Sequence, residues 1–274
     1  MKLYRTSSGI FVESGNAFYP VEARSWDELI SSDVLLARAT AAISGTARAS
    51  LEGLTLLAPV ESQEVWASGV TYYRSRSARM EESKDAGGGD FYDRVYYAER
   101  PELFFKSAGR RVIGSGGNVR IRRDASWSVP EPELTLLLSP SGNIAGYTIG
   151  NDMSSRDIEG QNPLYLPQAK NYDGACALGP CVLLASEPLP KTTTISIQIL
   201  RKGEIAFTGE TTLAEIKREF TELAGYLFRE SSFPDGVFLM TGTGVVPPDI
   251  FTLAIGDRIR ISIAGIGTLE NTVA

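Results

Sequence analysis

Two apolar segments joined by a short polar turn are the feature that most restricts how this chain folds. Residues 134–138 and 144–149 are rich in Leu, Ile and Thr, and the turn-forming run Ser139-Pro140-Ser141-Gly142-Asn143 separates them. The pattern predicts an antiparallel hairpin of two buried strands. In such a hairpin the residues before position 134 and those after position 149 meet at one end.

Acidic residues stand where this hairpin would close. Glu131 and Glu133 precede the first strand, and Asp152 follows the second. Residues two apart in an extended chain point to the same side, so the two glutamates would converge and the hairpin would return Asp152 toward them. Carboxylates held this close repel one another unless a cation lies between them. Oxygen ligands suit a hard cation, so Mg²⁺ is expected here, with Mn²⁺ or Ca²⁺ as substitutes.

Simpler explanations exist for the same acidic residues. Glu131 and Glu133 fit a solvated surface pair, and Asp152 and Ser154 fit helix N-caps for a helix over residues 155–159.

The chain contains no histidine among its 274 residues. Ser-His-Asp and Cys-His catalysis and histidine-bound metals are therefore excluded. Proton transfer would fall to Glu, Asp, Lys, Tyr or water. Lys170 lies among small apolar residues and is a candidate base, although the sequence alone favours a surface lysine. Cys176 and Cys181 are expected to be buried free thiols.

Bulk charge limits the choice of partners. Lys and Arg number 27 and Asp and Glu 33, giving a net charge of −6, and no basic stripe is present. Nucleic acid is therefore not an expected partner. An anionic substrate would need local positive charge at its site. No signal-peptide core and no apolar run of about 20 residues is seen, so no membrane partner is expected and the cytoplasm is the expected location.

The chain divides into an expected small N-terminal domain, residues 1–60, and a catalytic domain, residues 61–274. The first contains a hairpin over 9–19 and a helix capped by Ser25. The second is strand-rich, so the fold class is mixed α/β (α+β), with a long helix expected over 213–228. Strands are also expected over 65–70, 119–121, 181–184, 195–200, 237–240 and 258–263. The charged, glycine-broken segment 74–100 is a candidate lid or a plain surface loop.

Taken together, these pieces resemble the fumarylacetoacetate hydrolase superfamily. The resemblance covers about residues 61–270 and rests on motifs that occur in the family's order: Pro101-Glu102-Leu103-Phe104-Phe105-Lys106, Glu131-x-Glu133-Leu134, Gly146 through Asp157, Lys170 and Thr241-Gly242-Thr243. It implies a rolled mixed β structure, a homodimer or homotetramer, and Mg²⁺ bound by Glu131, Glu133 and Asp152.

Within the superfamily the chain resembles the dehydratases of 2-keto-3-deoxy sugar acids. The stretch Asn162-Pro163-Leu164-Tyr165-Leu166-Pro167-Gln168 carries this likeness, with Pro130-Glu131-Pro132-Glu133 and Val65-Trp66-Ala67-Ser68-Gly69. It implies dehydration of 2-keto-3-deoxy-arabinonate to 2,5-dioxopentanoate through a metal-stabilised enolate. Glu102 and Lys170 would be the acid/base pair. Residues expected to bind the 2-oxo acid substrate are Ser68, Lys106, Arg156 and Thr243.

One departure from the hydrolases favours a lyase. They carry Asn-Tyr-x-x-His near the start of the domain, whereas this chain has Thr71-Tyr72-Tyr73-Arg74-Ser75, with Ser75 about where the histidine would be. The alternatives are an acylpyruvate-type hydrolase, an oxaloacetate-type decarboxylase and a non-enzymatic binding protein.

Overall fold

The structure is a computed structural model that describes residues 1–73 and 94–274. The segment expected to form a lid or loop, 74–100, falls mostly outside the described residues, as does Ser75. The strands are β1 (Lys2–Thr6), β2 (Gly9–Ser14), β3 (Ala17–Pro20), β4 (Glu64–Gly69), β5 (Glu102–Ala108), β6 (Asn118–Val119), β7 (Ser128–Leu138), β8 (Ile144–Ser155), β9 (Cys176–Leu184), β10 (Thr194–Arg201), β11 (Glu204–Thr212), β12 (Val237–Met240), β13 (Arg258–Ile263) and β14 (Gly267–Val273). The helices are α1 (Trp26–Ile30), α2 (Leu35–Ala42), α5 (Arg156–Gln161), α6 (Leu166–Lys170) and α7 (Phe220–Leu227), with 3₁₀ turns η1 (Gly109–Arg111), η2 (Pro163–Tyr165) and η3 (Leu213–Glu215).

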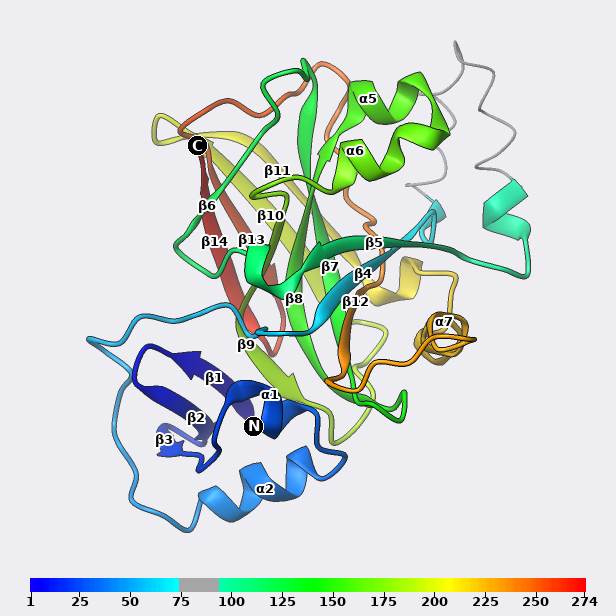
Figure 1. Cartoon of the computed structure of the whole chain (residues 1–274). Coiled ribbons are helices and arrows are strands. Elements are labelled where there is room, and N and C mark those ends of the chain that lie inside the picture. The colour runs from blue at the N-terminus through cyan, green and yellow to red at the C-terminus, as the bar shows by residue number, and fades with distance from the viewer. Residues whose placement is uncertain (74–93) are drawn as a thin grey trace.

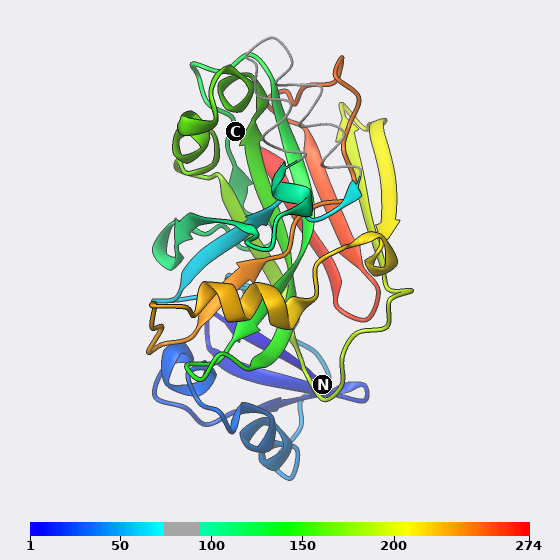
Figure 2. The same ribbon diagram turned by 90° about the vertical axis from the view of Figure 1, so that its right-hand side faces the viewer.

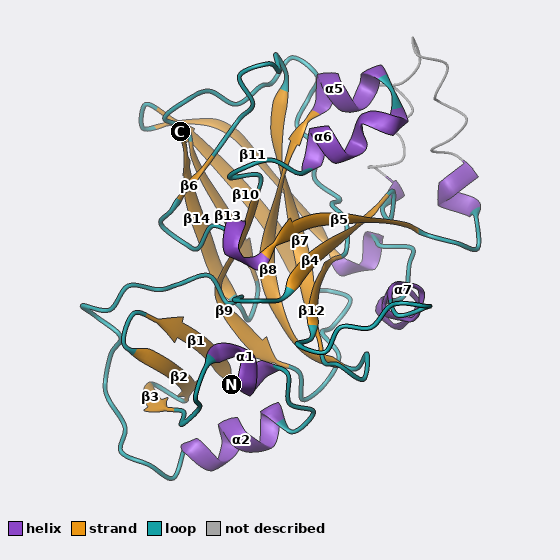
Figure 3. Ribbon diagram, viewed as in Figure 1, coloured by secondary structure: helices purple, strands orange, loops and turns teal. Residues whose placement is uncertain are grey.

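Strands outnumber helices, as expected for a β-rich mixed α/β protein (Figures 1 and 3). In the described part of the chain they form a nine-stranded sheet, ordered β3-β2-β1-β9-β8-β7-β12-β4-β5, and a five-stranded sheet, ordered β11-β10-β13-β14-β6. Most neighbours are antiparallel, but β12 pairs with β4 and β14 with β6 in parallel.

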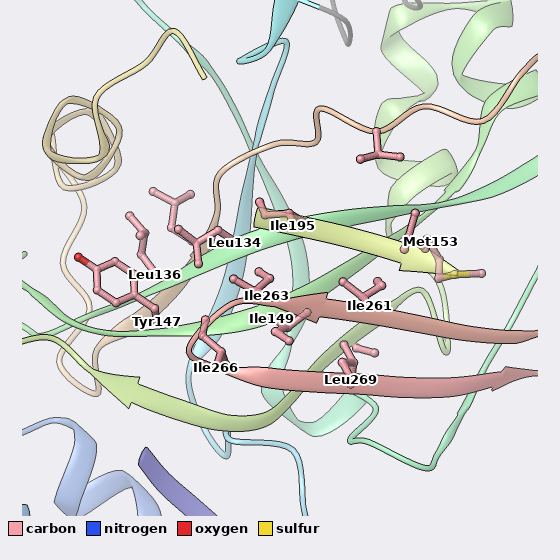
Figure 4. Close-up of a cluster of buried hydrophobic side chains, with 14 of the residues drawn as sticks. Leu134, Leu136, Tyr147, Ile149, Met153, Ile195, Ile261, Ile263, Ile266 and Leu269 are labelled. Carbon is pink, nitrogen blue, oxygen red and sulfur yellow. The ribbon is translucent and has the colours of Figure 1, made fainter. Parts of the chain in front are cut away.

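The main core lies between these two sheets. Figure 4 shows apolar side chains of β7 and β8, such as Leu134 and Ile149, against those of β13 and β14, such as Ile261 and Leu269. All four side chains are buried. Removing such side chains from water is the main force that holds the two sheets together.

The central hairpin is longer than its apolar residues predicted. β7 and β8 pair antiparallel, with Leu134 opposite Ile149 and Glu131 opposite Asp152. The three acidic residues therefore lie within the strands. Asp152 is not a helix cap, because α5 begins only at Arg156 and its N-cap, Ser155, makes no side-chain capping bond.

The N-terminal segment forms a unit at one end of the molecule (Figures 1 and 2). Its predicted hairpin is confirmed as β2 and β3, and its helix start is confirmed by the bond from the Glu28 backbone N–H to Ser25 Oγ at 3.1 Å. β1 also pairs with β9, with Leu3 opposite Val182, so this unit extends the large sheet. A domain boundary near residue 60 stays a prediction.

The long helix predicted over residues 213–228 is wrong in extent. Residues 213–215 form the turn η3, and a helix begins only at Phe220. Between them Ile216 bridges Tyr72, and the Lys217 N–H donates to Thr71 O at 3.0 Å. Leu213 and Ile216 are buried as their spacing suggested, but these bonds to a distant segment hold the backbone extended. The buried residues of α7 belong to the main core. Figure 2 shows this helix lying along the flank of the large sheet.

No helix in the described residues is long and apolar enough to cross a membrane. Cys176 and Cys181 are both buried free thiols, as expected.

Candidate active site

A polar pocket lies where the acidic end of the β7–β8 hairpin meets β4, β5 and α6. Its lining brings together predicted site residues from distant parts of the chain: Ser68, Glu131, Glu133, Asp152, Lys170 and Thr243. A larger cavity of about 700 Å³ lies between segment 55–61 and loop 109–117. Its lining holds none of these residues, so the chemistry belongs to the smaller pocket.

Three carboxylates share one buried point in this pocket. One oxygen from each of Glu131, Glu133 and Asp152 lies within 4.8 Å of the others. All three side chains are buried, which excludes a solvated surface pair. Burial, and then the charges of Asp152 and Glu131, raise the pKa of Glu133 well above its usual value. A buried all-oxygen donor set whose members repel one another suits a hard divalent cation.

Lys170 lies at the centre of the pocket and is not a surface lysine. It is fully buried at the end of α6. Its Nζ donates to Glu131 Oε2 at 2.5 Å, to Asp152 Oδ2 at 3.1 Å and to Ser154 Oγ at 2.6 Å. Three oxygen acceptors match the three donors of an ammonium group, so this geometry favours the charged form.

A second cation holds the other side of Glu131. Arg156, the first residue of α5, is 2% exposed and donates from Nη2 to Glu131 Oε1 at 2.7 Å. Glu131 thus accepts from Arg156 at one oxygen and from Lys170 at the other. The two charge-assisted bonds fix the carboxylate plane.

Lys106 lies near the pocket but does not line it. Its Nζ donates to the backbone oxygens of Met153, at 3.0 Å, and of Lys170, and forms an ion pair with Asp152 Oδ1. The predicted substrate contact of Lys106 has no support in this placement, and it stays untested.

Glu102, the first residue of β5, does not line the pocket but packs its carboxylate against Gly69, which does. The two residues are opposite one another in the β4–β5 pairing. A Cβ at Gly69 would lie 2.1 Å from Glu102 Oε2, so the glutamate occupies space that only glycine leaves open. Next to Gly69, the buried hydroxyl of Ser68 has no hydrogen-bond partner among the described residues, which leaves it able to bind a ligand.

The loop after β12 forms another wall. The Gly242 N–H donates to Glu133 Oε2 at 2.6 Å, and Gly242 has a φ of +94°. Thr243, predicted to bind substrate, lines the pocket and exchanges bonds of 3.2 Å with the backbone of Val245. Val70, also in the lining, has a φ of 53°, a strained conformation for a β-branched residue of the kind found at functional sites.

Two further residues of the site did not emerge from the sequence. The carboxylate of Glu159 is buried 4.0 Å from Lys170 Nζ, and the Phe104 ring centroid lies 5.8 Å from the same atom. Glu159 follows Arg156 by three positions on α5, so helical spacing places both on one face and would have given a signal. Phe104 gave none, because an aromatic residue on a strand is expected in any core.

The fold and the pocket agree with a family assignment. The model of the fumarylacetoacetate (FAA) hydrolase C-terminal family matches residues 70–274. The chain therefore belongs to this family, as its motifs indicated.

Two curated relatives and one solved structure share a dehydratase name. A probable 2-keto-3-deoxyxylonate dehydratase of Haloferax volcanii is 46% identical over 216 residues, which is 78% of this chain and 73% of that protein. A 2-dehydro-3-deoxy-D-arabinonate dehydratase of Saccharolobus solfataricus is 40% identical over 225 residues, or 81% and 76%. A solved structure of 2-keto-3-deoxy-D-arabinonate dehydratase, complexed with magnesium and 2,5-dioxopentanoate, matches with a TM-score of 0.84 and 32% identity over 100% of this chain and 98% of that one. The expected fold is thus confirmed.

Proposed function

We propose that this protein is a Mg²⁺-dependent lyase that removes water from a 2-keto-3-deoxy sugar acid, converting 2-keto-3-deoxy-arabinonate to 2,5-dioxopentanoate. The observation that carries the proposal is the buried three-carboxylate cluster in direct contact with Lys170. The two dehydratase relatives, at 46% and 40% identity, support the reaction class. The similar structure that contains magnesium and 2,5-dioxopentanoate supports the metal and the product.

Glu131, Glu133 and Asp152 would hold the metal. When bound there, Mg²⁺ polarises the 2-keto group and stabilises the negative charge that develops on its oxygen. Hydrogen bonds within the protein orient the carboxylate ligands before the metal binds. Arg156 and Lys170 orient Glu131, and the Gly242 N–H orients Glu133.

Dehydration requires a base for the C3 proton and an acid for the departing C4 hydroxyl. Lys170 donates to three oxygens and so holds its proton, which fits the acid. Glu102 approaches from β5 and is the base in this assignment. Loss of water between C3 and C4, followed by a proton shift from C5, gives 2,5-dioxopentanoate.

The substrate's carboxylate needs donors. The Ser68 hydroxyl and Thr243, which line the pocket, are proposed to bind it, together with Arg156, which pairs with Glu131 beside them. Positive charge from Arg156, Lys170 and the metal would offset the chain's net charge of −6 for an anionic substrate.

We also propose that residues 1–60 form an N-terminal unit and that residues 61–274 form the catalytic unit. We further propose that the protein is a homodimer or homotetramer and is located in the cytoplasm. Light scattering on the purified protein would test the oligomeric state.

The decisive experiment supplies the protein with Mg²⁺ and either the D or the L form of 2-keto-3-deoxy-arabinonate, and follows 2,5-dioxopentanoate by mass spectrometry. Product is expected from one form, and it should be lost with EDTA and in Glu133→Gln. The matched control Glu204→Gln changes an exposed glutamate on β11 and should keep full activity. Turnover of an acylpyruvate or oxaloacetate instead would move the enzyme to the hydrolase or decarboxylase class. Metal binding without turnover of any 2-oxo acid would indicate a binding protein.

A further inference from the structure

Lys106 is a fully buried cation that joins three separate parts of the site. It lies on β5, whereas its partners are Asp152 and Met153 on β8 and Lys170 at the end of α6. It donates to Met153 O at 3.0 Å and to Lys170 O, and its third contact is the ion pair with Asp152 Oδ1. An ammonium group has three N–H donors. Two donors go to the backbone oxygens of Met153 and Lys170, and the charge of the group faces Asp152 Oδ1.

The contact spans strands that are distant in the sheet. Among the strands that the structure describes, β5 is the edge of the nine-stranded sheet with β4 as its one neighbour, while β12 and β7 separate β4 from β8. Lys106 nevertheless reaches the backbone of β8, so the sheet curls until its edge strand faces the central hairpin. Figure 1 shows β5 crossing in front of β7 and β8. The Lys106 side chain bridges β5 to β8 and to the end of α6 beside the pocket.

Three residues of the site depend on this contact: Glu102, Asp152 and Lys170. Glu102 lies four positions before Lys106 on the same strand, and Phe104 between them lines the pocket and faces Lys170. The carboxylate of Asp152 contacts two lysines: Oδ1 pairs with Lys106, and Oδ2 accepts a hydrogen bond from Lys170. Lys106 also holds the backbone of Lys170, so one side chain sets the spacing of a metal ligand and both proposed acid/base groups.

We propose that Lys106 is a positioning residue that orients Asp152 for the metal and fixes the Glu102 strand against Lys170. The proposal rests on the proposed function for the roles of those residues. Its effect on metal affinity can be measured without substrate. Without Lys106, the Met153 and Lys170 carbonyls lose a buried donor and Asp152 Oδ1 loses its cation, so the carboxylate is free to turn away from Glu131 and Glu133.

The test is Mn²⁺ binding to metal-free protein, measured by electron paramagnetic resonance without substrate. Lys106→Met keeps the length of the side chain and removes its charge and donors. We expect Mn²⁺ affinity to fall by about 10- to 100-fold, the usual cost of losing a partner that orients a metal ligand. With saturating Mn²⁺ and substrate, kcat should fall by about tenfold or more while KM stays within about threefold.

A matched control separates positioning from lost stability. Arg201→Met removes the partner of another buried carboxylate, Asp257, which Arg201 Nη2 approaches at 2.7 Å. It should lower the melting temperature and leave Mn²⁺ affinity and kcat unchanged. If Lys106→Met does not fold, Lys106→Gln keeps an amide donor without the charge and is measured in the same way.

Three outcomes would overturn the proposal. Unchanged Mn²⁺ affinity with a raised KM would make Lys106 a substrate contact. Tighter Mn²⁺ binding would mean that Lys106 acts only as a repelling charge. Unchanged affinity and kinetics in a folded variant would remove any role in the site. Wild-type protein that binds Mn²⁺ but turns over no sugar acid would count against the proposed function alone.

Discussion

The carboxylate of Glu102 occupies the space that a side chain at position 69 would fill. A Cβ at Gly69 would lie 2.1 Å from Oε2 and 2.6 Å from Cδ of Glu102, its partner across the β4–β5 pair. Glycine at this position therefore leaves room for the glutamate carboxylate, and any residue with a Cβ would displace it.

Gly69→Ala is expected to lower activity without removing the metal. The added methyl group must displace Glu102, so the variant should lose about 100-fold in kcat, near the lower range for a lost acid/base group. Steady-state kinetics and Mn²⁺ titration would measure this. Gly225→Ala in α7 is the matched control, because its added Cβ would meet no described atom beyond its own helix within 4 Å, and it should keep full activity. Full activity of Gly69→Ala would mean that the position of Glu102 does not matter.

Metal should reverse the pH dependence of stability that comes from Glu133. Its raised pKa means that the metal-free fold favours the protonated carboxyl, so this contribution is present below the ordinary pKa and is lost as pH rises through the raised one. A bound cation favours the ionised form, so binding releases a proton and strengthens as pH rises through the same window. At about 100 times the dissociation constant, Mg²⁺ would add about 2.7 kcal/mol to the free energy of unfolding.

Melting curves with EDTA and with Mg²⁺ across this pH window would measure the difference. The two melting temperatures should diverge as pH rises, and Glu133→Gln should remove the divergence. Parallel curves for the wild-type protein would contradict the assignment of Glu133 to the metal.

The acidic cluster could be anticipated because it depends on local rules. Two-residue spacing on a strand and the short turn of one hairpin bring Glu131, Glu133 and Asp152 together, and the structure has Glu131 directly opposite Asp152. Their service as metal ligands stays a prediction. The hairpin itself was visible from composition, although its strands run further into polar sequence than the apolar residues showed.

Contacts between distant segments could not be anticipated in the same way. The reach of Lys106 from β5 to β8 depends on how the large sheet curls, and no local pattern encodes that curl. β11 was missed because this edge strand is largely exposed and polar, with little apolar alternation to reveal it. The break at Ile216 was missed because bonds from Lys217 to Thr71 overrode a good helical spacing.

Gly242→Ala should damage the carboxylate cluster from the opposite wall. A Cβ at Gly242 would lie 2.0 Å from Thr71 Oγ1, and the φ of +94° already disfavours any side chain. Thr71 cannot easily yield, because its hydroxyl donates to Thr241 O at 2.7 Å. The loop must shift, so the bond from Gly242 N to Glu133 is lost at a cost of about 1 to 3 kcal/mol for a buried acceptor.

Thermal unfolding and Mn²⁺ titration would show both effects of Gly242→Ala. Stability and metal affinity should fall together. Gly203→Ala offers a control for the backbone alone, since Gly203 also has a positive φ, of +90°, but open space around it. It should lose stability and keep the metal affinity of the wild-type protein. Equal Mn²⁺ affinity in all three proteins would show that the Gly242 loop does not support the cluster.

Lys170 should act through its proton and not through a covalent bond. A Schiff base with the 2-keto group requires a neutral, accessible amine. Lys170 Nζ instead donates to Glu131, Asp152 and Ser154 within 3.1 Å, which holds it as an ammonium group. Borohydride added during turnover should therefore leave no mass adduct on Lys170. Lys170→Met should lower kcat by about 100- to 10,000-fold, the range for a lost general acid, whereas Lys191→Met, at an exposed lysine, should not change it. An adduct on Lys170 would contradict the acid role and make the lysine a nucleophile, because only its neutral form attacks a ketone.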